Sequence, residues 1–279
     1  MTLIRPAAVA GLFYSDDAVL LHKDIDGFIK KAREIKNQQG DLEKPTTPTK
    51  AIIAPHAGYK YSGLCATMAY LSIEQERRDN IKNVILLGPA HRHPANGMAL
   101  SGADYWESPF GAMPINTAFA KKIAHLPQTE VNDRVHMQEH CLEVHVPFIQ
   151  KFFRNASLIP FAVTGLAAKS VAEVLEMLWG GDETLIVISS DLSQYHPYCD
   201  AMNIGKKTAN NIENFQESNI SGIHACGHVP LSGLLLLAKN KKMHISRLYM
   251  TNSGEAVEGA ELAKENNSKV VGYGAWRLH

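Results

Sequence analysis

Three short apolar runs in the sequence each lead into a side chain that could bind a metal ion or carry a proton. The first run precedes His56, the second precedes His91 and the third precedes Asp191. In open α/β sheets, ligands bind beside the carboxyl ends of the strands. If the three runs are strands of one sheet, we expect these side chains to meet at one end of it and to form the functional site.

Several other residues offer chemistry of the same kind. Imidazole and thiolate groups are ligands that suit iron, copper or zinc, and the chain contains 13 histidines among 279 residues. The further candidates are His140, Glu143, His145, His196, Cys226 and His228. Their wide spacing identifies no metal by itself, because a site assembled from several strand ends needs no fixed local motif.

Each candidate also has a structural interpretation. A single histidine after a strand is more often a hydrogen-bonded structural group than a ligand, but His56 and His91 both follow an apolar run and a nearby proline, which favours a shared site. Asp191 is either a helix cap or a site acid or orienting group, since a buried carboxylate needs a partner. Cys226 is either a packed residue beside a Gly227 helix cap, or a thiolate ligand or nucleophile.

The composition excludes several classes of function. The chain is 45% hydrophobic and 20% charged, as in soluble globular proteins, and its 28 basic residues balance 28 acidic ones. No overall charge therefore favours nucleic acid or an anionic membrane. We find neither a signal-peptide pattern nor an apolar run long enough to span a bilayer, and we expect a cytoplasmic protein. Four scattered cysteines predict no disulfide framework, and the absence of phosphate-binding loops argues against nucleotide-dependent chemistry.

Strand-like and helix-like segments alternate from about residue 50 to the C-terminus. This alternation predicts an α/β fold with a central mixed, largely parallel sheet flanked by helices. The expected strands are 51–54, 84–87, 98–101, 157–163, 185–189, 245–249 and 270–275, the one at 185–189 being central. The expected helices are 15–36, 62–75, 117–124, 140–153, 168–179, 200–216 and 230–239. No linker is evident, so we expect residues 1–279 to form a single domain.

Prolines and glycines predict local details. Pro147 predicts a kink or break in the helix that contains it, and Pro160 predicts that its strand is an edge strand or ends there. Residues 104–114 are expected to be a loop with edge pairing, residues 1–14 an irregular segment and residues 38–50 a surface loop.

Five ordered motifs resemble those of the Memo family, which includes the AmmeMemoRadiSam system protein B of prokaryotes. They span nearly the whole chain and are APHAGYKYSG at 54–63, LGPAH at 87–91, EHCLEVHVPF at 139–148, SSDLS at 189–193 and CGHVP at 226–230. The family is similar in fold to class III, LigB-type extradiol dioxygenases, which use non-haem Fe(II) held by two histidines and a carboxylate. A Memo-like domain over residues 1–279 is therefore expected to share that fold.

The resemblance implies a ligand set and a cofactor. His56, His91 and Cys226 would be the metal ligands, with the cysteine in the place of the dioxygenase carboxylate. Asp191 and His140 would be catalytic residues beside them, with His140 lining the same pocket. The implied cofactor is non-haem Fe(II) or copper, with zinc possible in principle, because a thiolate favours softer metals and is itself oxidisable.

One position departs from the family pattern. A histidine often stands three residues after Ser-Ser-Asp as an acid or base, whereas this chain has Gln194 there. Glutamine cannot carry a proton at neutral pH. Either His196 takes the catalytic role, or this member lacks that group.

These observations leave competing functions. The first is a metal-dependent redox enzyme related to extradiol dioxygenases, with an unknown small-molecule substrate. The second is a non-catalytic module that binds a peptide or small ligand in the same pocket. A third is metal-assisted hydrolysis with Asp191 as base. The family name also implies a radical-SAM protein partner.

Overall fold

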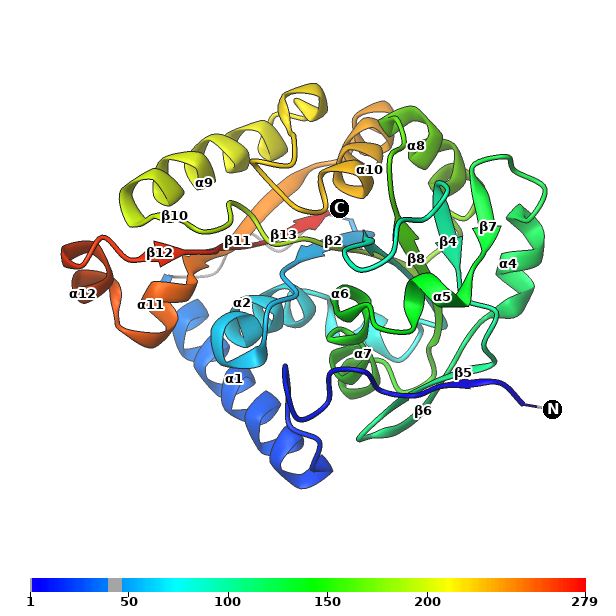
Figure 1. The fold of residues 1–279 in the computed structure, drawn as a ribbon, viewed down its shortest axis with the longest axis horizontal. Helices are drawn as coiled ribbons and strands as arrows, with labels where there is room; N and C mark the ends of the chain where they lie inside the picture. Colours follow the sequence, from blue (N-terminus) through cyan, green and yellow to red (C-terminus); the bar gives the residue numbers. More distant parts are fainter. Residues whose placement is uncertain (1, 40–46) are drawn as a thin grey trace.

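A computed structural model describes residues 2–39 and 47–279 (Figure 1). The predicted surface loop at 38–50 falls largely on residues 40–46, which lie outside the described residues. The predicted helix before it is α1 (Ala18–Gln39), which continues beyond the expected end at residue 36.

The fold is built on an eight-stranded mixed sheet with the strand order β11-β13-β2-β9-β3-β8-β4-β7. The four central strands, β2, β9, β3 and β8, run parallel to one another, whereas β13 and β4 are antiparallel to their inner neighbours. The strands are β2 (Ala51–Ala54), β3 (Asn83–Pro89), β4 (Met98–Leu100), β7 (Thr129–Val131), β8 (Ser157–Val163), β9 (Thr184–Ser189), β11 (Ile245–Asn252) and β13 (Gly272–Leu278). The predicted α/β architecture and the central place of β9 are confirmed.

Helices cover both faces of the sheet. In Figure 1, α8 (Ala168–Met177), α9 (Tyr198–Glu213) and α10 (His228–Asn240) lie above it, and α1, α2 (Tyr59–Leu71), α6 (His140–Glu143) and α7 (Val146–Phe152) lie below. Successive strand residues point to opposite faces: Ile52 joins the core with the lower helices, and Ile53 joins the core with the upper ones. A strand buried on both faces needs a continuous apolar sequence, which explains the runs that predicted these strands.

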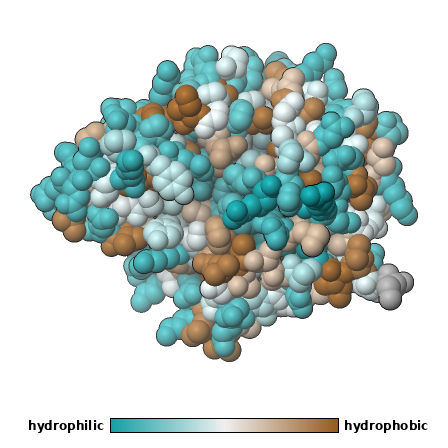
Figure 2. All heavy atoms as spheres, in the orientation of Figure 1, coloured by the Kyte–Doolittle hydropathy of each residue, from teal (hydrophilic) through white to brown (hydrophobic). Residues whose placement is uncertain are grey.

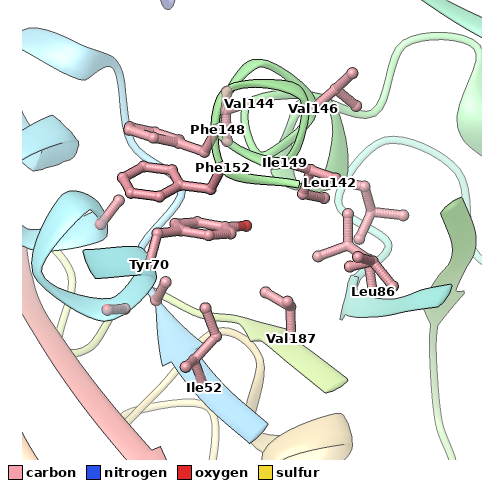
Figure 3. Packing of buried hydrophobic residues seen from close by; sticks show 14 of the residues in the cluster. Ile52, Tyr70, Leu86, Leu142, Val144, Val146, Phe148, Ile149, Phe152 and Val187 are labelled. Atoms are coloured by element: carbon pink, nitrogen blue, oxygen red, sulfur yellow. The ribbon is translucent and has the colours of Figure 1, made fainter. Parts of the chain in front are cut away.

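The core below the sheet contains a stack of aromatic rings (Figure 3). Tyr70 of α2 stacks on Phe148 and Phe152 of α7, with ring centroids 5.3 and 5.8 Å apart. Ile52 and Val187 meet this stack from the sheet side. The packing fixes α7, and with it the segment that carries His140, against the strands that carry His56 and Asp191.

The helix predicted over residues 140–153 is divided into α6 and α7. The chain leaves the helix at Val144 and His145, and Pro147 lies in the first turn of α7. Proline is tolerated there because the first N–H groups of a helix have no partner within it. The predicted break is therefore present, but it precedes the proline.

The prediction of an edge strand or strand end at Pro160 is wrong, because β8 is an interior strand. It pairs with β3 along its length and with β4 over residues 161–163. Leu158 directs its carbonyl away from β3, toward the N–H of Asn116. Pro160 lies two residues further and faces the same side. Since β4 begins only after it, the missing N–H of Pro160 removes no bond from either ladder.

Smaller elements complete the domain. Residues 104–114 form a hairpin of β5 (Tyr105–Ser108) and β6 (Gly111–Pro114), so the predicted edge pairing is confirmed. The N-terminal β1 (Ile4–Arg5) pairs with β5, so residues 1–14 are not wholly irregular. The remaining elements are α3 (Gln75–Arg78), α4 (Thr117–Ile123), α5 (Asp133–His136), β10 (His196–Pro197), η1 (Glu217–Asn219), α11 (Ser253–Val257), α12 (Ala260–Glu265) and β12 (Lys269–Val270).

The face shown in Figure 2 is mostly hydrophilic, with hydrophobic residues in separate patches. Within residues 2–39 and 47–279, every helix is too short or too polar to cross a membrane.

Candidate metal centre

The carboxyl ends of three adjacent parallel strands bring the predicted residues together. His56, His91 and Asp191 each lie two residues beyond the end of β2, β3 and β9, which are neighbours in the sheet. The His56 N–H donates to Asp191 Oδ1 at 2.8 Å, and the rings of His56 and His91 have centroids 5.3 Å apart. The expectation that these side chains meet at one end of the sheet is therefore confirmed.

His140, the first residue of α6, completes a group of three imidazoles. Its ring centroid lies 5.5 Å from that of His56 and 5.0 Å from that of His91. One nitrogen of each ring belongs to a set in which all atoms lie within 4.8 Å of one another. A second set within that limit contains His91, Glu139 and Cys141. Three convergent imidazoles are a donor set that suits zinc, iron or copper.

The tautomer of His56 follows from its neighbours. Its Nδ1 lies 2.7 Å from Ser189 Oγ, and that hydroxyl donates to the carbonyl of Cys141 at 2.7 Å. Because Ser189 has only one hydroxyl proton, its oxygen must accept the Nδ1–H of His56. Nε2 of His56 is therefore unprotonated. Burial, together with the neighbouring His91 and His140, lowers the pKa of His56 well below its usual value, which keeps the ring neutral.

A buried carboxylate, Glu139, orients His91. Oε1 of Glu139 accepts from His91 Nδ1 at 2.9 Å, and Oε2 accepts the His91 N–H at 2.6 Å. His140 Nδ1 lies 3.3 Å from the same Oε1, but without the alignment of a hydrogen bond. Burial alone would raise the pKa of Glu139, but His140, His91 and the Cys141 N–H hold that pKa well below its usual range. The carboxylate is therefore ionised at neutral pH.

Asp191 is the second carboxylate of the site, and its pKa is shifted in the direction opposite to that of Glu139. Burial raises its pKa to about 6, although the His56 N–H and the nearby imidazoles partly offset that effect. Its Oδ2 lies 3.9 Å from His56 Nε2. A carboxylate with a pKa near neutrality beside a candidate metal position can accept or donate a proton.

Cys226 lies next to His56, near the same ring nitrogen as Asp191 Oδ2. Its Sγ is 3.3 Å from His56 Nε2 and accepts the Asp191 N–H at 3.3 Å. Burial and the Asp191 charge raise the pKa of the thiol to about 12, so in the metal-free protein the S–H donates to His56. Gly227 is the N-cap of α10, so it caps the helix that follows Cys226 and does not end a preceding one, as the structural interpretation expected. Cys226 is thus in contact with His56 but lies outside the set of three imidazoles.

The other candidates lie further from this group. His196 belongs to β10 and pairs with Val270 of β12. The cleft is lined by Gln194 and not by His196. His145 is fully buried and shares a 2.9 Å hydrogen bond with Tyr70. Glu143 binds Arg5 at 2.8 Å. The catalytic role of His196 stays a prediction.

The three imidazoles lie at the wall of a cleft of about 770 Å³. The cleft is bounded by the N-terminal segment on one side and by residues 253–271 on another. Phe13 packs against His140 with ring centroids 4.7 Å apart, and Tyr61 and Tyr273 add further aromatic surface. Arg92 and Lys269 bring positive charge to the lining. Small organic ligands bind in clefts of this size.

Sequence reasoning missed two residues that orient the imidazoles. Glu139 directly precedes His140, and Ser189 directly follows the run of residues 184–188. Both positions lie inside motifs that were singled out, but an acid or a serine at a helix or strand terminus is commonly a cap. Their orienting role became visible only through the hydrogen bonds.

The fold and the site define an α/β protein with a candidate metal centre of histidines at the ends of its parallel strands. The family model described as "Memo-like protein" matches residues 5–276. The chain is 30% identical to a "MEMO1 family protein" of Metallosphaera sedula, over 98% of this chain and 99% of that protein. It is 36% identical to one of Aquifex aeolicus, over 70% of this chain and 68% of that protein. The chain belongs to the Memo family.

The chain also has a partial likeness to a solved structure. The crystal structure of uncharacterized protein JW3007 from Escherichia coli K12 has a TM-score of 0.48 and 10% identity, covering 81% of this chain and 99% of that one.

Proposed function

We propose that this Memo-family protein is a metal-dependent redox enzyme, similar in chemistry to extradiol dioxygenases, that acts on a small organic substrate. The observation that carries this proposal is the convergence of His56, His91 and His140 on an open cleft. A site with two or more histidines and open coordination positions is typical of non-haem iron oxygenases.

The residues present fit a metal ion. His56 and His91 each direct Nδ1 to a protein acceptor, Ser189 and Glu139, which leaves Nε2 as the donor atom. We propose these two as ligands together with Cys226, whose Sγ already touches His56 Nε2 at 3.3 Å. Iron or copper, with zinc as a further candidate, would supply Lewis acidity and, except for zinc, one-electron chemistry.

The surrounding side chains would bind the substrate and move its protons. Asp191, with a pKa raised to about 6, is the proposed base for a phenolic or hydroxyl proton. Phe13, Tyr61 and Tyr273 offer surfaces for an aromatic ring. Gln194 in the lining can hydrogen-bond but cannot carry a proton. The second proposed acid or base is therefore His196, which would have to move from β10 into the cleft to act.

Oxygen consumption tests this proposal. Protein loaded anaerobically with Fe(II) or copper is mixed with a panel of diphenols and oxygen uptake is followed. We expect metal-dependent uptake with at least one diphenol, abolished by His56→Ala and by a chelator. His93→Ala, in the same loop as His91 but outside the imidazole group, is the matched control and should retain it. Uptake that is absent from the metal-loaded wild type, or unaffected by the chelator, would contradict the proposal.

A second function is favoured by the mouth of the cleft. Leu12 and Tyr195, which line it, are 80% and 73% exposed. Exposed apolar groups around a pocket suit a non-catalytic module that binds a peptide or small ligand. That function predicts ligand affinity that is unchanged by a chelator and by His56→Ala, whereas the redox function predicts that both weaken binding.

The family's name suggests a further proposal about partners and location. We propose that the protein acts in the cytoplasm together with a radical-SAM protein. Co-purification of the two from cells under anaerobic conditions would support this, and their separate elution without mutual effect on activity would count against it.

A further inference from the structure

We propose that His140 is a direct metal ligand beside His56 and His91, and that Glu139 is the positioning residue that holds His91 and His140 for this purpose. The inference rests on the proposed metal centre. It goes beyond it by assigning a third nitrogen ligand and the carboxylate that presents it.

The first observation is that a single fixed carboxylate serves both rings. Glu139 is 1% exposed, and its Oε1 lies 2.9 Å from His91 Nδ1 and 3.3 Å from His140 Nδ1. The carboxylate cannot rotate freely, because it also accepts the N–H groups of His91 and Cys141 at 2.6 and 3.1 Å. Both imidazoles therefore lie against one carboxylate oxygen whose position is fixed.

The second observation is the mutual orientation of the rings. The planes of His91 and His140 are inclined by only 24°, with centroids 5.0 Å apart. Since both rings turn Nδ1 toward the same oxygen, their Nε2 atoms lie on the opposite side, where both residues line the cleft. Phe13 packs on His140 at 4.7 Å and limits its rotation. The His140 ring is 16% exposed, so its free edge is accessible from the cleft.

The third observation is the position of His56. Its ring is nearly perpendicular to that of His140, at 87°, and to that of His91, at 74°. Nitrogens of the three rings lie within 4.8 Å of one another. Metal–nitrogen bonds are about 2.0–2.1 Å long, so inward movements on the order of 1 Å would let all three reach one ion. Three ligands on one side leave the cleft side open.

A histidine ligand whose other nitrogen donates to a carboxylate is held in one tautomer and is a stronger donor. Loss of such a carboxylate typically costs about 10–100-fold in metal affinity. Glu139 would act in this way on His91, and its charge, 3.3 Å from His140 Nδ1, would act on the second ring without a hydrogen bond.

Glu139 also caps α6, so a purely structural role must be separated from the proposed one. Glu139→Gln retains the side-chain shape but removes the negative charge beside both imidazoles. Its NH2 group must also face existing N–H donors, either the backbone N–H groups of His91 and Arg92 or the Nδ1–H of His91 and the Cys141 N–H. Glu143→Gln is the matched control. Glu143 is the other buried carboxylate of the same segment, and its partners are Arg5, Tyr14 and backbone N–H groups instead of imidazoles.

The experiment uses Cu(II) as the probe. Pulsed EPR counts the imidazoles bound to Cu(II) in the full-length protein, and competition with a chelator measures affinity. We expect three imidazoles in the wild type and two in His140→Ala, while His93→Ala keeps three. We expect Glu139→Gln to lower affinity about 10–100-fold, and Glu143→Gln to lower it less than about threefold even if it lowers the unfolding temperature more.

Three outcomes distinguish the ways in which the proposal can fail. Two imidazoles in the wild type, unchanged in His140→Ala, would overturn the role of His140 and leave the proposed metal centre standing. Equal losses of affinity in Glu139→Gln and Glu143→Gln would overturn the positioning role of Glu139. A wild type that binds no Cu(II) would overturn the proposed metal centre itself.

Discussion

Glu139 and Glu143 lie at opposite ends of the four-residue helix α6, and both are almost fully buried. Glu139 faces the rings of His91 and His140, whereas Glu143 accepts hydrogen bonds from Arg5, Tyr14 and the N–H groups of Ala8 and Val9. Among the donors around Glu143, Arg5 also donates to the carbonyls of His136 and Glu139, so these contacts hold the N-terminal segment to this part of the chain. The imidazoles of His91 and His140 turn Nδ1 toward Glu139, so the Nε2 atom of each ring points away from it. Both carboxylates are buried, so burial does not distinguish them. They differ in their partners, because only the imidazoles beside Glu139 have a second nitrogen that could bind a metal ion.

The two regions are also mechanically connected. Glu143 holds the N-terminal segment against α6, and that segment carries Phe13, which packs on His140. The Phe13 carbonyl further accepts the Tyr59 N–H at 2.7 Å. A structural carboxylate thus supports one wall of the candidate metal centre without touching a ligand. Substitutions at the partners of each carboxylate can separate this support from direct positioning of the ligands.

The largest expected effect is on stability in the Glu143 region. Arg5→Ala removes the partner at 2.8 Å and leaves the Glu143 charge buried. Breaking one side of a buried ion pair costs about 3–5 kcal/mol. Denaturant unfolding should show a loss of that size in the free energy of unfolding. A loss below about 1 kcal/mol would mean that the backbone N–H groups alone satisfy Glu143.

The next effect concerns Asp191, a third buried carboxylate with fewer donors than the other two. Its pKa is raised from 3.8 to about 6, so the folded state binds the proton more tightly than the unfolded state. Its contribution to stability is fully present below pH 4 and is lost as the pH rises toward 6. The loss is at most about 3 kcal/mol. This decline should appear in the difference in the free energy of unfolding between the wild type and Asp191→Asn, measured on the metal-free proteins between pH 4 and 7. The lowered pKa of His56 changes stability in the opposite direction in both proteins. An identical pH profile in the two proteins would contradict the raised pKa.

Ser189 tests the orientation of the remaining ligand. Ser189→Ala removes the acceptor of His56 Nδ1 at 2.7 Å, so the ring can adopt the wrong tautomer. We expect metal affinity to fall about tenfold, less than in Glu139→Gln because only one imidazole is affected. Chelator competition measures this. Unchanged affinity would show that packing alone orients His56.

The smallest effect is expected for Tyr14→Phe. The hydroxyl donates to Glu143 at 2.8 Å, and a hydrogen bond to a charged group contributes about 1.5–3 kcal/mol. Three other donors remain, so we expect a loss near the lower value in denaturant unfolding, with metal affinity unchanged. A large fall in metal affinity would instead show that the N-terminal segment acts directly on the site.

The fold was predictable where one physical factor dominates. Strands buried on both faces require apolar runs, and the runs before His56, His91 and Asp191 therefore identified β2, β3 and β9. Pro160 misled because an interior strand needs its N–H only where a neighbour pairs, and the short length of β4 is not visible in the sequence. His56, His91 and Asp191 could be predicted to lie close together because parallel strands end at the same edge of a sheet. The orienting roles of Glu139 and Ser189 depend on which side chains pack behind the rings, which no local pattern encodes.

The most direct test of the metal centre is the metal content of the protein after anaerobic purification and equilibrium dialysis against Fe(II) or copper. We predict one ion per chain, bound more tightly than about 1 µM, in the wild type and in His93→Ala, and its loss in His56→Ala. A wild type that binds no ion at that affinity, or a His56→Ala variant that binds as tightly as the wild type, would contradict the account.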